Sequence, residues 1–155
     1  MLHEEYYWQL GDDFINLFNS HHEQTFTPGI TVCVNESMVH WHGNDRDWIH
    51  AGLLSHIAIK RKSENGAEVH SSCCRGSGIM MQLKIRKTKA CTLHELLWQE
   101  GPSINKGARV LKELVVPWAN TKRLVVADSA FSSVQTANEL HRIGLHKALL
   151  LEAFE

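Results

Sequence analysis

The sequence lacks the features that mark several specialised classes of protein. Sixteen basic and seventeen acidic residues give the 155-residue chain a formal net charge of −1, which excludes a strongly basic nucleic-acid-binding arm and leaves only local basic patches. No apolar segment approaches the roughly 18 residues of a membrane span, and no signal-peptide pattern follows Met1, so we expect a soluble, unsecreted protein. None of the four cysteines belongs to a Cys-x-x-Cys pair, and an intracellular chain would keep them reduced.

Two kinds of β-strand are present instead. Alternating apolar and polar residues predict half-buried strands at 30–34 and 79–86, the second with Gln82, Lys84 and Arg86 pointing outward. Apolar runs without alternation are typical of strands buried on both faces. Such runs occupy residues 124–127 and 147–151, and further strand candidates occupy residues 57–62 and 66–73.

Helical periodicity and capping signals separate these strands. The predicted helices cover residues 4–20, 92–101, 105–116 and a segment from about 132 that ends at Gly144. The order predicts an α/β fold with a mixed five-stranded sheet, three antiparallel strands followed by β-α-β. We expect residues 1–27 to form a helical lead-in and residues 28–155 to form the core domain.

A single carboxylate, Asp128, follows the apolar run at 124–127. Ligands and catalytic groups collect beyond the carboxyl ends of strands in open α/β sheets, so Asp128 is a candidate metal ligand or base. An aspartate there also fits an N-cap of the next helix. The sequence around Asp128 leaves both interpretations open.

The motifs resemble those of a known family when they are taken in order. Phe18-Asn19, Pro28-Gly29 and Val32-Cys33-Val34-Asn35-Glu36-Ser37-Met38 are similar to the start of the piggyBac transposable element-derived transposase domain, which has Val-Asp-Glu-Ser-Met in the last of these. Ala127-Asp128-Ser129-Ala130-Phe131-Ser132-Ser133 resembles its second acidic motif. The resemblance covers residues 13–151 and implies a ribonuclease H-like fold.

In the resembled family, three aspartates bind two divalent ions, Mg²⁺ or Mn²⁺, that cut and join DNA. Two ions about 4 Å apart hold the attacking and leaving oxygens, which requires shared carboxylates. Here the first aspartate is replaced by Asn35, and an amide has one neutral oxygen to offer. Strand alternation directs the neighbouring Glu36 to the opposite face. Asp128 remains as a weak residual metal ligand.

The chain also ends at Glu155, before the helix that carries the third acid in the family, so we expect the sheet to be incomplete at its C-terminal end and open to self-association. We therefore predict a catalytically inactive relic of a cut-and-paste transposase, with no bound cofactor. The alternative is a domesticated DNA- or protein-binding module without catalysis. The resemblance implies a nuclear protein.

Basic residues on two predicted strands are candidate contacts to DNA phosphates. They are Lys60, Arg61, Lys62, Lys84 and Arg86. The competing interpretation is that these charges keep an edge strand from pairing with other chains. Other constellations are weaker, because the cysteines and His40-x-His42 match no familiar zinc spacing.

Overall fold

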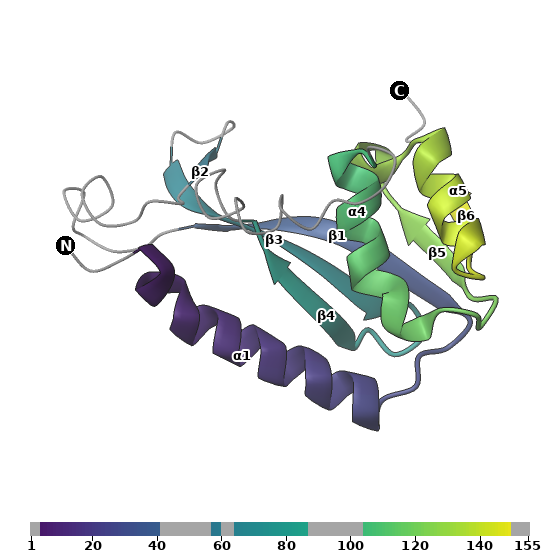
Figure 1. The fold of residues 1–155 in the computed structure, drawn as a ribbon, viewed down its shortest axis with the longest axis horizontal. Helices are drawn as coiled ribbons and strands as arrows, with labels where there is room; N and C mark the ends of the chain where they lie inside the picture. Colours follow the sequence, from purple (N-terminus) through teal and green to yellow (C-terminus); the bar gives the residue numbers. More distant parts are fainter. Residues whose placement is uncertain (1–3, 41–56, 60–63, 87–103, 150–155) are drawn as a thin grey trace.

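The computed structural model describes residues 4–40, 57–59, 64–86 and 104–149. These residues form a mixed β-sheet with helices packed against it (Figure 1). The elements, in chain order, are α1 (Glu4–Thr25), β1 (Thr31–His40), β2 (Ile57–Ile59), β3 (Glu64–Cys74), β4 (Met80–Ile85), α4 (Lys106–Val115), η1 (Val116–Trp118), β5 (Leu124–Ala127), η2 (Ser129–Phe131), α5 (Val134–Arg142) and β6 (His146–Leu149).

The sheet has the strand order β2-β3-β1-β5-β6, and β4 also pairs with β3. β3 is antiparallel to β1, β2 and β4, whereas β1, β5 and β6 run parallel to one another. The predicted α/β class is confirmed, with three antiparallel strands followed by a parallel β-α-β unit. Each of the six strand candidates has a counterpart among β1 to β6, with β2 at the candidate 57–62. The described sheet therefore has six strands where five were expected, because β2 also pairs with β3.

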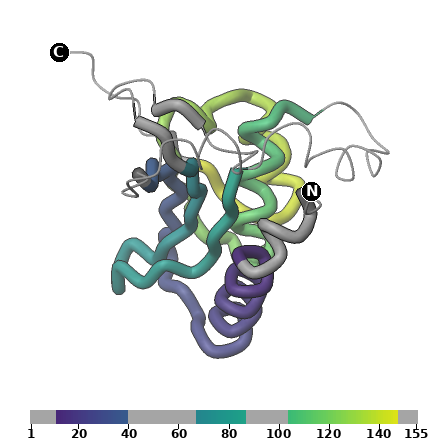
Figure 2. The backbone as a smooth tube through the Cα atoms, turned by 90° about the vertical axis from the view of Figure 1, so that its left-hand side faces the viewer, coloured from purple at the N-terminus to yellow at the C-terminus, as the bar shows by residue number. Residues whose placement is uncertain are grey.

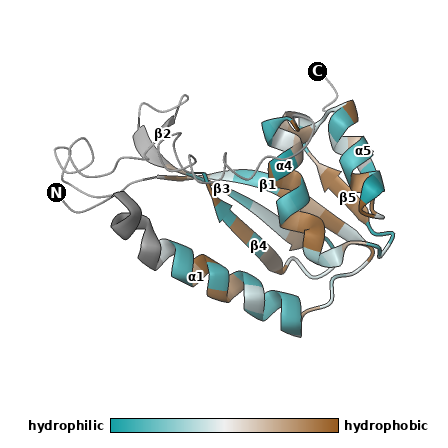
Figure 3. Ribbon diagram, viewed as in Figure 1, coloured by the Kyte–Doolittle hydropathy of each residue, from teal (hydrophilic) through white to brown (hydrophobic). Residues whose placement is uncertain are grey.

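The core lies between the sheet and α4. Val32 and Val34 of β1 are buried beside Val125 and Ala127 of β5, as the parallel register requires. They pack with the apolar side of α4, where Leu111 is fully buried. Brown, hydrophobic ribbon marks this side of α4 and the run of β5 (Figure 3). The predicted alternation of β1 is therefore confirmed by burial.

Helix α1 covers the outer edge of β4 (Figure 2). The side-chain amide of Asn19 donates from Nδ2 to the carbonyl oxygen of Leu83 at 3.0 Å, and its Oδ1 accepts from the Leu83 amide at 2.8 Å. Gln82 donates to the carbonyl oxygen of Asn19 and to the carboxylate of Glu23. A side-chain amide thus bonds the strand as a neighbouring peptide would.

These contacts correct two sequence predictions. The first helix extends to Thr25 instead of ending at Ser20, because contacts with β4 hold its polar second half. Gln82 is 5% exposed, although alternation placed it outward. Gln82 is the cross-strand partner of Ser72, which is fully buried, and its side-chain amide donates to residues of α1.

Other differences concern the ends of elements. β1 continues beyond the predicted residues 30–34 to His40, because β3 pairs with it along its length. β6 begins at His146, one residue before the prediction. The predicted helix at 92–101 and the basic residues at 60–62 lie outside the described residues. Among the described helices, none has the length and apolar character needed to cross a membrane.

We expect Asn19→Ala to lower the free energy of unfolding by about 1–3 kcal/mol, because the amide and carbonyl of Leu83 lose their partners at a partly buried edge. Urea unfolding followed by circular dichroism measures the change. Ser20→Ala is the matched control, since its hydroxyl bonds only a carbonyl of its own helix. An equal effect in both variants would show that the Asn19 contact does not anchor α1.

Candidate functional site

The parallel pair β1 and β5 brings Asn35 and Asp128 to neighbouring positions. The paired register ends with Val34 opposite Ala127, and each candidate residue follows directly after its strand partner. Because Val34 and Ala127 face the core, strand alternation places the side chains of Asn35 and Asp128 on the opposite face. The two residues that the motifs single out thus lie side by side at the end of the parallel pair.

Local hydrogen bonds already engage both side chains. Asn35 Oδ1 accepts from the amide of Glu36 at 2.9 Å, and Asp128 Oδ1 accepts from the amide of Ala130 at 2.9 Å. Asp128 is thereby the N-cap of η2, the structural role that the sequence left open. Capping uses one carboxylate oxygen and does not exclude a second role for the other.

The opposite face of the same strand carries a different polar group. Glu36 is the cross-strand partner of His70, and Glu68 lies two residues before His70 on the same face of β3. Glu68 and His70 are each 5% exposed. One ligand atom from each of the three side chains lies within 4.8 Å of the others. We call Glu36, Glu68 and His70 the Glu-Glu-His cluster.

The hydrogen bonding of His70 is incomplete. Its Nε2 lies 2.8 Å from Glu68 Oε1, and the ring meets Phe131 of η2 edge-on with centroids 5.9 Å apart. Burial lowers the pKa of His70 and outweighs the opposing effect of Glu68 and Glu36, so the imidazole is neutral at neutral pH. Within the described residues, Nδ1 has no hydrogen-bond partner although it is buried.

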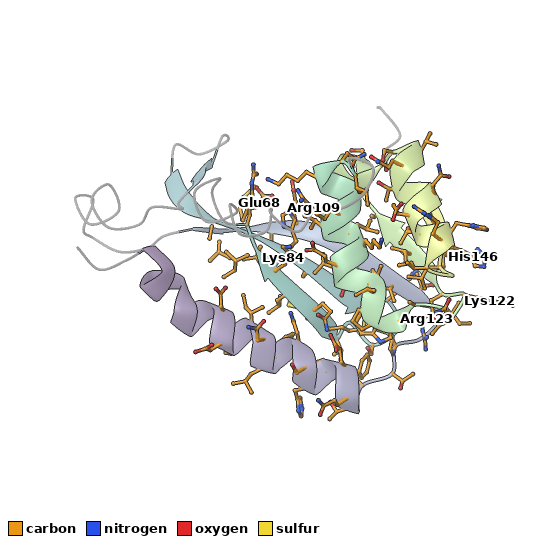
Figure 4. All side chains as sticks on the ribbon, in the orientation of Figure 1. Glu68, Lys84, Arg109, Lys122, Arg123 and His146 are labelled. Atoms are coloured by element: carbon orange, nitrogen blue, oxygen red, sulfur yellow. The ribbon has the colours of Figure 1, made fainter. Side chains whose placement is uncertain are left out.

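Four cations lie near this cluster. Arg86 pairs with Glu68, and Lys84 pairs with Glu113 of α4. Lys106 and Arg109, in the first turn of α4, add two further cations, and burial together with the charge of Arg86 lowers the pKa of Lys106. Figure 4 shows Glu68, Lys84 and Arg109 on the side of the sheet that α4 covers. We call Lys84, Arg86, Lys106 and Arg109 the basic group.

The three described cysteines lie on two faces of the sheet and form no zinc-ligand cluster among the described residues. Cys33 and Cys73 are cross-strand partners, and burial raises the pKa of Cys73, with the neighbouring Cys33 thiol as a second cause. Cys74 is buried on the other face, where its Sγ accepts from the amide of Gly29 at 3.4 Å. All three are free thiols. The side chains of His40 and His42 lie outside the described residues.

Sequence reasoning missed Glu68, His70, Lys106 and Arg109. The pattern Glu68-Val69-His70 puts two polar side chains on one face of a strand, but only the register with β1 shows that Glu36 joins them. Lys106 and Arg109 are three residues apart at a helix start with no acidic residue in the first turn. Lys84 and Arg86 share one face of the strand, as alternation predicted. That face is the one that α4 covers, where Lys84 pairs with Glu113, and not the solvent side that was expected.

The match to known proteins agrees with this geometry. A polar pair at the ends of two adjacent parallel strands, next to an antiparallel extension, is the arrangement of a ribonuclease H-like sheet. Residues 9–152 match the family model described as Transposase IS4, so the chain belongs to this transposase family. No curated protein matches the sequence.

A solved structure shares the fold. It is the cryo-EM structure of a piggyBac transposase synaptic complex with hairpin DNA, with a TM-score of 0.71 and 18% sequence identity. The similarity covers 96% of this chain and 28% of that transposase. The chain therefore spans about a quarter of the length of the transposase it resembles, whose fold it has.

Asn35, within β1, and Asp128, directly after β5, do not fit a two-metal centre. Two closely spaced divalent ions need anionic oxygens that bridge them. Asn35 offers one neutral oxygen, which already accepts a hydrogen bond, and Asp128 offers one carboxylate that caps η2. Glu36 cannot replace the missing acid, because it faces His70 on the other side of the sheet.

We expect Asp128→Ala to lower the free energy of unfolding by about 1 kcal/mol because the cap is removed, and Asp128→Asn to lower it less. Chemical unfolding in the presence of a chelator measures both. Ser129→Ala, next along the chain and exposed, is the control. A gain in stability on removing the Asp128 carboxylate would contradict the capping role.

Proposed function

We propose that this chain is a transposase-derived domain that does not cut or join DNA. The observation that carries the proposal is the position of Asn35, which lies next to Asp128 on the parallel strand pair. Replacing a carboxylate by an amide keeps the size of the side chain and removes the charge that a Mg²⁺ site requires. Membership of the transposase family supports the origin of the domain.

The proposal predicts that Mg²⁺ produces no saturable shift in the NMR signals of Asp128 and Ala130, and that supercoiled plasmid is not nicked. Asn35→Asp should create a carboxylate pair and give a saturable Mg²⁺-dependent shift at these residues. Asn35→Asp combined with Asp128→Asn is the control, because it restores one acid while removing the other. Mg²⁺-dependent nicking by the unaltered chain would overturn the proposal.

A second function is favoured by the basic group. We propose that Lys84, Arg86, Lys106 and Arg109 bind the phosphates of double-stranded DNA, which would place the protein in the nucleus. Lys106 and Arg109 form no ion pair with any described residue, whereas Lys84 pairs with Glu113 and Arg86 pairs with Glu68. The solved transposase with this fold was captured with hairpin DNA, which supports DNA as the partner. The two proposals are compatible, since binding needs no metal.

Replacing Lys106 and Arg109 together by Gln should weaken DNA binding and reduce the slope of log K against log salt by roughly 0.9 for each phosphate that the variant no longer neutralises. Fluorescence anisotropy with a labelled duplex at several salt concentrations measures the slope. Lys122→Gln is the control, because this exposed lysine precedes β5, away from the basic group (Figure 4). Equal slopes in the three proteins would exclude the basic group as the DNA-binding surface.

A further inference from the structure

The Glu-Glu-His cluster is a preorganised set of ligand atoms that neither proposed function uses. Glu36 comes from β1, whereas Glu68 and His70 come from β3, and the antiparallel register holds Glu36 opposite His70. All three side chains point to the face that α4 and η2 cover, where Phe131 lies against the His70 ring. The backbone hydrogen bonds between β1 and β3 therefore fix the Cα positions from which the three side chains extend.

Two of the three side chains have ligand capacity that the described residues leave unused. His70 Nδ1 is buried without a hydrogen-bond partner, a state that costs free energy in a protein interior. No described cation forms an ion pair with Glu36, whereas Arg86 pairs with Oε2 of Glu68. Within the described residues, the charge of Glu68 is therefore balanced by a neighbouring cation and that of Glu36 is not.

We propose that Glu36, Glu68 and His70 bind one divalent transition-metal ion of the Zn²⁺ class. Three protein ligands of nitrogen and oxygen type, with one position left for water, are an established coordination set for zinc. Ligands about 2.1 Å from one ion lie at most about 4.2 Å apart, so side-chain movements of less than about 1 Å bring atoms now within 4.8 Å into coordination.

The cations near the cluster favour a metal that binds through nitrogen over one that binds through oxygen alone. Arg86 and Lys106 lie close to Glu68 and oppose a cation held by charge alone. An ion that gains its affinity from an imidazole nitrogen is less dependent on net charge than Mg²⁺ or Ca²⁺, which prefer oxygen ligands.

This site is distinct from the position that metals would occupy in an active relative. Asn35 and Asp128 lie on the other face of β1 and β5, so the sheet itself separates the two sets of side chains. The proposal therefore stands whether or not the domain is catalytically inactive. It can be tested without any assay of activity.

Titration of the whole chain with Co²⁺, followed by its visible ligand-field absorption, tests the proposal. We expect saturable bands at one equivalent, which Zn²⁺ displaces. Glu36→Gln and His70→Gln should each weaken Co²⁺ binding by roughly tenfold or more. Glu36 is only partly buried, so its variant remains informative if His70→Gln unfolds.

Two controls separate this site from its neighbours. Asp128→Asn should leave the titration unchanged, because Asp128 faces away from the cluster. Cys33→Ser should also leave it unchanged, and a sulfur-to-cobalt band in the near ultraviolet would instead place the ion on the thiols. Bands that survive Glu36→Gln, or no saturable bands in the unaltered chain, would overturn the proposal.

Discussion

The two-residue repeat of β1 determines which chemistry each face of the sheet presents. This strand is hydrogen-bonded to β3 on one side and to β5 on the other, so it cannot rotate or slip by one residue without breaking both pairings. Asn35 and Glu36 are adjacent in the chain and yet belong to different polar groups. Phe131 links the two groups, because the element that Asp128 caps places its ring against His70.

The parts of the fold that depend on local signals could be predicted from the sequence. The apolar runs identified β5 and β6, and helical periodicity identified α4, which lies within the predicted range 105–116. Parts that depend on distant contacts could not be predicted. The second half of α1 is held by β4, and Gln82 is buried because it lies opposite Ser72 and bonds to α1.

The same distinction applies to the candidate site. Asn35 and Asp128 could be paired in advance, since each follows a strand within a motif that resembles a known family. Glu68 and His70 had no such motif, and their relation to Glu36 follows only from the antiparallel register. Asparagine has nearly the volume of aspartate and lacks its charge, so the proposed loss of metal chemistry at Asn35 requires no change in the fold.

The contact between Asn19 and Leu83 occupies the outer edge of β4, where another strand would otherwise pair. Beyond β3 the sheet continues into β2 and β4, and α1 occupies the outer side of β4 with a side chain that imitates a peptide group. At the other end, β6 pairs with β5 and with no further described strand. Among the described strands, α1 occupies the edge of β4, whereas the terminal strands β2 and β6 each have one edge without a described strand as a neighbour.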